Sequence, residues 1–338
     1  MYMDQIQSIS EDSEHSLKEL FRYSECQICG GEKSCMIYPI DKEYAAKYSG
    51  IDINQVSIGV YRCNNCYHQY VQPLPQPLFL KAFYSSYMSK ASNGFYRESL
   101  EDEIPYRFRQ HYGKWLKQIK ILHPTAKSIL DVGAGFGMFL RLAKEYGFEG
   151  VGVEPNTQAS EFIKEKYGFE IYNSMLEDVE SEKNYDIITM WDLLEHLPNP
   201  RIALQKVNGI TTQGGFLVIE LPARDSFIHL LVKGIYRMSF GYIKRPLFSV
   251  YGIHHLQYFS KKSIIDFLNN NGFKVIEVYR CQTNVKALLK KSHKKFSILI
   301  CCYNLCLRLS FLLGKILKKQ NKMVVFAKKN DELDKKEI

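Results

Sequence analysis

The 338-residue sequence predicts an α/β fold, in which a mainly parallel β-sheet is covered by helices on both faces. Two observations support this fold class. From Ser128 onward, apolar runs of strand length alternate with stretches of helix length, which is the pattern of βαβ units. The runs are almost continuously apolar, as expected of strands buried on both faces. Apolar residues form 46% of the chain and charged residues 24%, a globular balance that excludes wholesale disorder.

The individual elements of this fold follow from run length and periodicity. Strands are expected at 128–133, 149–155, 169–173, 185–191 and 216–222, with helices at 137–147, 157–168 and 201–210 between them. A TTQGG turn is expected at 211–215, just before the fifth of these strands. A helix at 260–272, a strand at 273–280 and a strand at 323–329 complete the domain. We expect the last two strands to pair at the edge of the sheet, with a large insertion between them.

The chain is longer than the roughly 100–200 residues of one typical domain, so we expect more than one part. The predicted parts are a loose leader at 1–22, a small cysteine-rich module at 23–77, a helical linker at 78–123, the large α/β domain at 124–329 and a charged tail at 330–338. Two insertions are expected within the large domain, at 222–253 and 286–320.

The N-terminus and the charge distribution bear on location and partners. The first 16 residues are polar and acidic and lack the apolar core of a signal peptide, so we expect a cytoplasmic protein. The formal net charge is +9, but residues 280–329 hold thirteen Lys or Arg and no Asp or Glu. The positive charge is therefore local, and no nucleic-acid partner is expected.

Four of the nine cysteines are spaced as metal ligands. Cys26 and Cys29 form one CxxC pair, and Cys63 and Cys66 form another. Cysteines of a cytoplasmic protein are expected to be reduced, and four thiolates on two such turns match the tetrahedral site that zinc prefers. We therefore expect a structural Zn²⁺ ion, closed to substrates, with a redox-active cysteine pair as the alternative.

A glycine-rich turn follows the first strand of the large domain, in SILDVGAGFGMFL at 128–140. Gly133, Gly135 and Gly137 lie between a strand and a helix, so a ligand can lie against bare backbone near the positive end of the helix. The dinucleotide fingerprint GxGxxG requires a glycine where Met138 stands. Here the spacing is GxGxG, preceded by Asp131.

Taken in order, DVGAGFG, VGVEP, YDIITMWDLLEHLPNP, GGFLVIELP and HHLQYFSKKSIIDFLNNNGF resemble the class I S-adenosylmethionine (SAM) methyltransferases that act on small molecules, sugars and lipids. This resemblance covers roughly half the chain and implies the Rossmann-like sheet and the SAM cofactor of that family. The alternative is a packing turn in an unrelated α/β domain. The stretch YRCNNCYHQYVQPLP also resembles the zinc-ribbon leader of some bacterial sugar and natural-product methyltransferases, where it helps to shape the acceptor pocket.

The resemblance also implies a set of cofactor-binding residues. These are Asp131 with the backbone of Gly133, Ala134, Gly135 and Gly137 for the amino acid end of SAM, Glu154 for the ribose, Met175 and Leu176 for the adenine, and Trp191 beside the reactive methyl. An Asp that the family often places near the adenine amine is missing.

Three histidines are candidates for the base that removes the acceptor proton. All three follow strand ends, on the side where open α/β sheets bind ligands. His255 matches a family position just ahead of the Tyr-Phe-Ser run and is ranked first. His196 is ranked second, with a backbone-bonded histidine at a helix end as its alternative. His254 is ranked third, with exposure to solvent as its alternative.

Asp192, Glu195 and His196 resemble the Glu-x-x-Glu-His metal trio of ubiquinone-pathway O-methyltransferases, with Asp in the first place. Residues at i, i+3 and i+4 share one helical face, so the trio can hold a divalent ion. The alternative is that these residues serve only the structure of a short helix.

The two insertions are basic and apolar. The one at 222–253 lies where the family carries its substrate lid. The one at 286–320 predicts a helix with a broad apolar face, in which Asn304 and Arg308 argue against a membrane span. Such a helix suits the anionic inner face of a membrane, and a cap over the sheet or a homodimer interface is an equal alternative.

The sequence as a whole predicts a SAM-dependent methyltransferase. We expect O-methylation of a sugar, a lipid-linked glycan or another small metabolite, with C-methylation as a variant. An RNA methyltransferase is the first alternative, but the fourth strand lacks the Asn-Pro-Pro-Tyr type of loop used by amino-group base methylases. A non-catalytic SAM-binding or scaffold protein is the second, and the presence of both Asp131 and Glu154 weighs against it.

Overall fold

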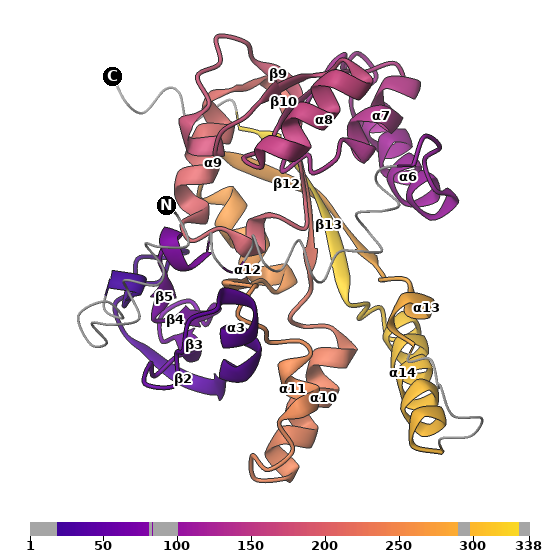
Figure 1. The fold of residues 1–338 in the computed structure, drawn as a ribbon. Helices are drawn as coiled ribbons and strands as arrows, with labels where there is room; N and C mark the ends of the chain where they lie inside the picture. The colour runs from indigo at the N-terminus through magenta and orange to yellow at the C-terminus, as the bar shows by residue number, and fades with distance from the viewer. Residues whose placement is uncertain (1–18, 81–82, 84–100, 290–297, 331–338) are drawn as a thin grey trace.

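In the computed structural model, which describes residues 19–80, 83, 101–289 and 298–330, a seven-stranded sheet forms the centre of the larger part (Figure 1). Its strands are β6 (Ser128–Val132), β7 (Glu149–Val153), β8 (Glu170–Tyr172), β9 (Tyr185–Trp191), β10 (Thr211–Pro222), β12 (Phe273–Cys281) and β13 (Lys322–Lys329). The strand order is β12-β13-β10-β9-β6-β7-β8, and only β13 is antiparallel to its neighbours. The predicted α/β class, with a mainly parallel sheet, is confirmed.

The end of the sheet that carries β12 and β13 differs in two details from the prediction. The two strands pair antiparallel, as expected, but β13 lies between β12 and β10, so only β12 is at the edge. The turn predicted at 211–215 is instead the start of β10, whose register with β9 shifts between Thr211 and Phe216. Gly214, with φ of 76°, supplies the left-handed residue that this irregularity requires.

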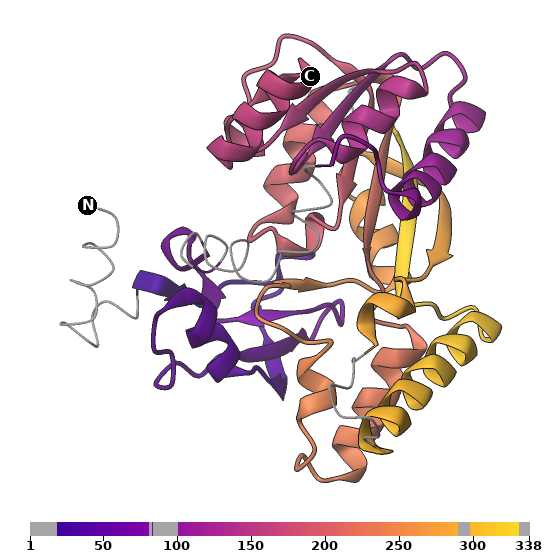
Figure 2. The same cartoon turned by 45° about the vertical axis from the view of Figure 1, so that its right-hand side comes forward.

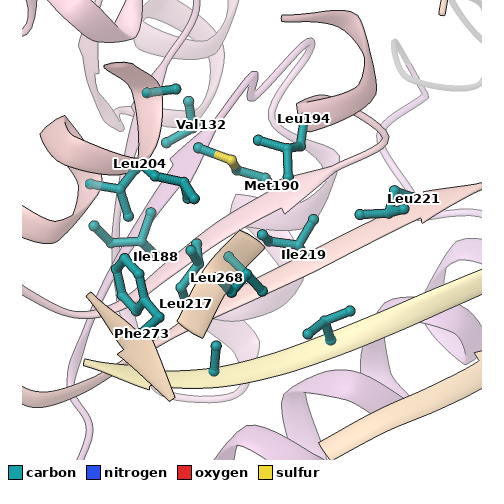
Figure 3. Close-up of a cluster of buried hydrophobic side chains, with 14 of the residues drawn as sticks. Val132, Ile188, Met190, Leu194, Leu204, Leu217, Ile219, Leu221, Leu268 and Phe273 are labelled. Atoms are coloured by element: carbon teal, nitrogen blue, oxygen red, sulfur yellow. The ribbon is translucent and has the colours of Figure 1, made fainter. Parts of the chain in front are cut away.

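Helices cover both faces of the sheet, as predicted. They are α6 (Tyr106–Leu122), α7 (Met138–Glu145) and α8 (Thr157–Tyr167) on one face, and α9 (Pro200–Gly209) and α12 (Lys261–Asn269) on the other. Neighbouring residues of β6 point to opposite faces, Ile129 toward α6 and α7 and Leu130 toward α9 and α12. Figure 3 shows the core on the side of α9 and α12, to which Met190 of β9, Leu217 of β10 and Leu204 of α9 belong.

The helix α6 corrects the prediction of a linker at 78–123. Trp115, Leu116 and Ile119 of α6 are buried in the same core as Phe139 and Phe326. The end of the expected linker is therefore part of the sheet domain. Within the rest of 78–123, residues 81–82 and 84–100 lie outside the described part of the chain.

The N-terminal part of the chain forms a second, smaller sheet. This sheet contains β2 (Ser34–Pro39), β3 (Gly59–Cys63) and β4 (Gln69–Gln72), with α3 (Lys42–Ser49) between β2 and β3 in the chain. The short strands β1 (Phe21–Arg22) and β5 (Leu74–Pro75) pair with each other in a separate two-stranded sheet. The Asp41 carboxylate accepts from Tyr44 N at the start of α3, and Gly50 ends the helix in a left-handed conformation. Of the segments predicted at the chain ends, the leader is described only from residue 19 and the tail only at residue 330.

A strand from the large domain completes this smaller sheet. The sheet order is β11-β4-β3-β2, and β11 (Gln257–Tyr258) follows directly after His254 and His255. His68 is fully buried and its Nε2 lies 3.1 Å from Oε1 of Gln257. The pairing of β4 with β11 therefore fixes the histidine segment against the N-terminal module.

The two insertions carry the helices α10 (Phe227–Met238), α11 (Arg245–Phe248), α13 (Val285–Leu288) and α14 (Ile298–Ile316). The predicted lid segment carries α10 and α11, whose buried residues share a core with the N-terminal module. The helix α14 packs mainly against α10, and Phe227 N donates to Lys319 O at 2.9 Å. In both views these helices project from the same end of the molecule (Figures 1 and 2). In the part of the chain that the structure describes, no helix meets both the length and the apolarity needed to cross a membrane.

Candidate active site

The loops at the carboxyl ends of β6, β7 and β9 meet at one edge of the sheet, where open α/β folds bind their ligands. The turn of residues 133–137 is bound to the end of β7, because Gly133 N and Ala134 N both donate to Val153 O, at 2.8 and 3.1 Å. These two hydrogen bonds therefore fix the glycine turn to the end of β7.

Two glycines in the turn have different roles. Both have left-handed φ, 54° at Gly135 and 74° at Gly137. A Cβ at Gly137 would lie 3.1 Å from Ile163, so this glycine permits the close packing of α8. A Cβ at Gly135 would meet nothing within 4 Å, so bare backbone there faces open space. Gly135 is thus the position where a ligand can approach the main chain.

Glu154 lies at the border of this open space. Its carboxylate accepts from Gly135 N at 2.8 Å and from Asn156 N at 2.9 Å. Burial raises the pKa of Glu154, and the two backbone N–H groups oppose that rise because they stabilise the charged form. A carboxylate oriented in this way retains free lone pairs that can accept hydrogens from a ribose diol.

Asp131 is almost fully buried, at 2% exposure, below the glycine turn. Thr189 Oγ1 donates to its carboxylate at 2.7 Å. Burial and the nearby Glu154 outweigh this hydrogen bond and raise the pKa of Asp131 to about 7. A cationic ligand group close to this carboxyl would stabilise its ionised form.

The two residues predicted to line the adenine are separated in the structure. The Leu176 side chain, at the start of a 3₁₀ turn (Leu176–Asp178), is buried in the core with Val153 and Val179. Met175 is 49% exposed just before that turn. Of the two predicted side chains, only Met175 therefore presents an apolar surface to a ligand.

Trp191, at the end of β9, belongs to an aromatic wall with Tyr112 and Phe139. Its ring centroid lies 5.0 Å from that of Phe139 and 5.2 Å from that of Tyr112. The buried Nε1 of Trp191 has no hydrogen-bond partner among the described residues. A buried donor without a partner is costly, which favours an acceptor group supplied by a ligand.

A charged cluster that the sequence analysis did not identify lies beside this wall. It consists of His111 on α6, Asp192 after β9, Glu220 near the end of β10 and Lys322 at the start of β13. His111 Nε2 donates to Glu220 Oε2 at 2.6 Å, and Lys322 Nζ donates to Glu220 Oε1 at 2.8 Å and also to Asp192. This charge cluster joins residues from four elements.

The charge cluster keeps Glu220 ionised. Burial raises the pKa of this carboxyl, but Lys322 and His111 outweigh it and lower the value to about 2. The two carboxylates in turn hold the pKa of Lys322 well above its ordinary value, despite burial. Because Glu220 accepts from Nε2, it orients the imidazole of His111 through that nitrogen.

The three predicted histidines lie together between the sheet and the N-terminal module. The ring of His255 lies 4.8 Å from that of His196 and 4.2 Å from that of His254. Nδ1–H of His196 donates to His254 O at 2.6 Å, the backbone bond expected under its structural alternative. His254 is half-buried and contacts Tyr44 of α3, so it does not simply face solvent.

All three imidazoles are held neutral. Burial is the first cause in each case, and it lowers the pKa of His196 to about 3 and that of His254 to about 4. Burial and the neighbouring His254 and His196 lower the pKa of His255 well below its ordinary value. Neutral imidazoles are metal ligands and weak proton acceptors.

Asp192, Glu195 and His196 were expected to come together as possible metal ligands, but the structure brings together a different set of residues. Ligand atoms of Glu195, His196 and His255 lie within 4.8 Å of one another, whereas Asp192 pairs with Lys322. The reason is local backbone geometry, because the segment forms only a 3₁₀ turn (Leu194–His196) and Asp192 has φ of 50°. Both Glu195 oxygens are buried without a hydrogen-bond partner among the described residues. A divalent cation would satisfy this donor set.

The four predicted metal ligands, Cys26, Cys29, Cys63 and Cys66, come together in the N-terminal module. Their Sγ atoms lie within 4.8 Å of one another, with 3.6 Å for both Cys26–Cys66 and Cys29–Cys63. Four sulfurs about 2.3 Å from one tetrahedral ion are separated by about 3.8 Å, so these distances fit zinc. Disulfide-bonded sulfurs would be about 2.05 Å apart.

Each cysteine pair lies on a tight turn that holds its sulfurs inward. Gly30 N donates to Cys26 O, and Tyr67 N donates to Cys63 O. Asn65 N also donates to Cys63 Sγ at 3.3 Å. The pKa of Cys66 is lowered to about 5, and the hydrogen bond with Cys26 is the largest cause. The four sulfurs and the two turns that carry them could hold one metal ion.

The chain is similar to several known proteins. An uncharacterised protein of Methanocaldococcus jannaschii is 22% identical over 182 residues, which cover 51% of this chain and 81% of that protein. The mitochondrial ubiquinone biosynthesis O-methyltransferase of Candida albicans is 25% identical over 123 residues, which cover 32% of this chain but only 37% of that protein. A SAM-dependent methyltransferase of known structure from Archaeoglobus fulgidus is 20% identical, with a TM-score of 0.43, over 66% of this chain and 99% of that chain.

A family model described as a methyltransferase domain matches residues 104–278, more than half of the chain, from just before α6 into β12. The chain therefore belongs to the methyltransferase-domain family, with the Rossmann-like α/β fold predicted from its sequence.

Proposed function

We propose that this protein is a SAM-dependent methyltransferase in which the glycine turn and Glu154 hold the cofactor. The observation that carries the proposal is the open space beside Gly135, bordered by the oriented carboxylate of Glu154. SAM, when bound, supplies an electrophilic methyl group on a sulfonium sulfur. The backbone around Gly135 would hold its amino acid end, Glu154 its ribose and the exposed side chain of Met175 its adenine.

The acceptor atom is most consistent with an oxygen of a sugar, a lipid-linked glycan or another small metabolite. The similarity to a ubiquinone biosynthesis O-methyltransferase supports oxygen over carbon. The aromatic wall of Tyr112, Phe139 and Trp191 gives the site a dry side, where the acceptor lone pair can be placed in line with the methyl group. A hydroxyl acceptor also has to lose its proton, which requires a nearby base.

Two histidines can serve as that base, and their surroundings differ. His255, ranked first from the sequence, lies among other imidazoles, and its protonated form is strongly disfavoured there. His111 is held by the 2.6 Å hydrogen bond between its Nε2 and the ionised carboxylate of Glu220, which fixes the orientation of its ring. We rank His111 first on this ground and keep His255 as the second candidate. His255 could instead hold a divalent ion with Glu195 and His196.

The cysteine cluster is proposed to bind one structural zinc ion. Its support is the tetrahedral sulfur spacing and the absence of disulfide bonds among the described cysteines. The ion would join the two cysteine turns, one before β2 and one before β4, and hold them in place. Since β4 pairs with β11, the zinc site would also stabilise the position of the histidine segment.

The ribose assignment is tested by Glu154→Gln, which keeps the size of the side chain and removes its charge. Hydrogen bonds to charged groups are worth about 1.5–3 kcal/mol, so SAM affinity should fall roughly tenfold to a hundredfold. Isothermal titration calorimetry measures the change. Glu149→Gln, at the exposed opposite end of the same strand, is the matched control and should bind like the unsubstituted chain. Equal affinity of the two variants would contradict the assignment.

The pKa of Asp131, about 7, predicts that SAM binding depends on pH. A cationic amino group near this carboxyl lowers its pKa in the complex, so binding releases a proton. Affinity should be highest above pH 7 and fall as the pH decreases, at most about tenfold per unit. Calorimetric titrations between about pH 5.5 and 7 stay below the range in which the cofactor amino group loses its proton, since its pKa is about 7.7–8.0. Asp131→Asn should bind with no such pH dependence; a retained slope would assign it to another group.

An acceptor is first identified by labelled methyl transfer to a panel of nucleotide sugars, glycolipids, hydroxylated metabolites and RNA. The choice of base can then be tested with that acceptor. His111→Asn should then lower kcat by about a hundredfold to ten-thousandfold and leave SAM affinity unchanged. His123→Asn, at the end of the same helix, is the control. A larger loss in His255→Asn than in His111→Asn would reverse the ranking. Transfer to RNA alone would overturn the acceptor class.

The zinc proposal predicts about one zinc ion per purified chain. Cys63→Ser should remove most of this zinc and lower the thermal midpoint, because the ion links two turns of the module. Cys35→Ser, which lies outside the cluster, should keep both zinc content and stability. Metal analysis and differential scanning calorimetry give the two readouts. A zinc-free protein whose cysteine pairs oxidise and reduce reversibly would instead support the redox alternative.

A further inference from the structure

The helix α14 has one face that is packed and one that is not. Ser310, Phe311 and Gly314 are buried toward α10, where a Cβ on Gly314 would lie 3.6 Å from the Cβ of Phe227. The opposite side, here called the outward face, consists of exposed uncharged residues. They are Cys301, Cys302, Leu305, Cys306, Leu309, Leu312, Leu313 and Ile316.

The outward face is continuous along the helix. Leu305, Leu309, Leu312 and Ile316 follow one another at intervals of four, three and four residues, which places them in one row. All four are exposed, and no described residue covers the row. An exposed apolar surface of this extent is typical of an interaction site.

The neighbouring helix α10 leads into a second exposed apolar segment. The loop of residues 239–244 after α10 carries Phe240, which is 92% exposed, and Tyr242, which is 89% exposed. Phe240 has φ of 51°, in a turn where Phe240 N donates to Arg237 O. Figures 1 and 2 both show α10 and α14 side by side, projecting away from the large sheet. The two apolar surfaces therefore belong to one projecting end of the molecule.

The charges carried by these two segments have a single sign. Residues 226–260 and 280–329 contain no Asp or Glu. The exposed or half-buried cations of α10, α11, α14 and their ends include Lys233, Arg237, Lys244, Arg245, Arg308, Lys315, Lys318 and Lys319. Basic side chains beside an apolar face, with aromatic residues at the boundary, complement a surface that is anionic outside and apolar within.

We propose that the outward face of α14 and the loop of residues 239–244 bind the surface of an anionic lipid bilayer. A second copy of the chain is a poorer occupant, because each copy would bring only cations to the contact. The proposal goes beyond the transfer reaction and does not depend on it, since docking can be measured without an acceptor or a cofactor.

The experiment is flotation of the full chain with phosphatidylcholine vesicles, with and without phosphatidylglycerol. The chain should float with the anionic vesicles, remain unbound with the neutral ones, and dissociate from the anionic ones as salt is raised. The double variant Leu309→Glu/Leu312→Glu should lose about tenfold or more of its bound fraction, since it places carboxylates in the apolar face. Ile121→Glu, at a 69% exposed position on α6, is the matched control and should float normally.

A second pair of variants tests the charges alone. Arg308→Gln/Lys315→Gln should weaken binding and reduce its salt dependence, whereas Lys117→Gln/Lys164→Gln, two exposed lysines on α6 and α8, should not. Circular dichroism and thermal unfolding verify that each variant is folded. Equal binding to neutral vesicles, or none to either kind, would overturn the proposal. Light scattering that shows a dimer, which Leu309→Glu/Leu312→Glu dissociates, without vesicle binding would assign the face to a second copy.

Discussion

The carbonyl of Val153, at the end of β7, organises the candidate cofactor site, because it accepts hydrogen bonds from two successive residues of the glycine turn. Because of these bonds, the backbone of Gly135 faces open space. They also place its N–H where it donates to the carboxylate of Glu154, the residue that follows β7. The turn can adopt this shape only with left-handed backbone, which glycine permits at little cost. One short backbone contact therefore places both the bare main chain and the acidic group that a nucleoside ligand requires.

The rest of the site depends on residues that arrive from distant parts of the chain. Lys322, at the start of the antiparallel strand β13, lies between Asp192 and Glu220 and neutralises the charge that two carboxylates would otherwise accumulate. His111 reaches Glu220 from α6, the helix that precedes the first strand of the domain. On the other side, β11 ties the histidine segment to the N-terminal module. The candidate acceptor region is thus bordered by three separate segments: α6, the start of β13, and the histidine segment held by the N-terminal module.

Much of the fold and part of the site follow from local sequence patterns. Alternating apolar runs predicted the strands, and the GxGxG spacing with Asp131 and Glu154 identified the turn and the acidic residue that the structure brings together. The four cysteines were also recognised, because their paired spacing is itself the signal. Contacts between distant residues could not be predicted in this way. His111 and Glu220 are 109 residues apart, and β11 is two residues long, too short for any periodicity.

Two site residues lie in surroundings that the sequence did not indicate, and the reason is the same. Leu176 matched a family position for adenine, yet its side chain fills the core, and only the packed structure shows which way it points. Asp192 was considered, beside a purely structural alternative, as part of a helical metal trio, but it has a left-handed backbone and pairs with Lys322, whereas His255 joins Glu195 and His196. Helix periodicity does not apply to a 3₁₀ turn of three residues.

A crystal structure of the complex with S-adenosylhomocysteine tests the central claim most directly. The account requires density for the homocysteine part along the backbone at Gly135, with both ribose hydroxyls within hydrogen-bond distance of Glu154. Density for the nucleoside at another edge of the sheet, or a ribose that Glu154 does not contact, would contradict it.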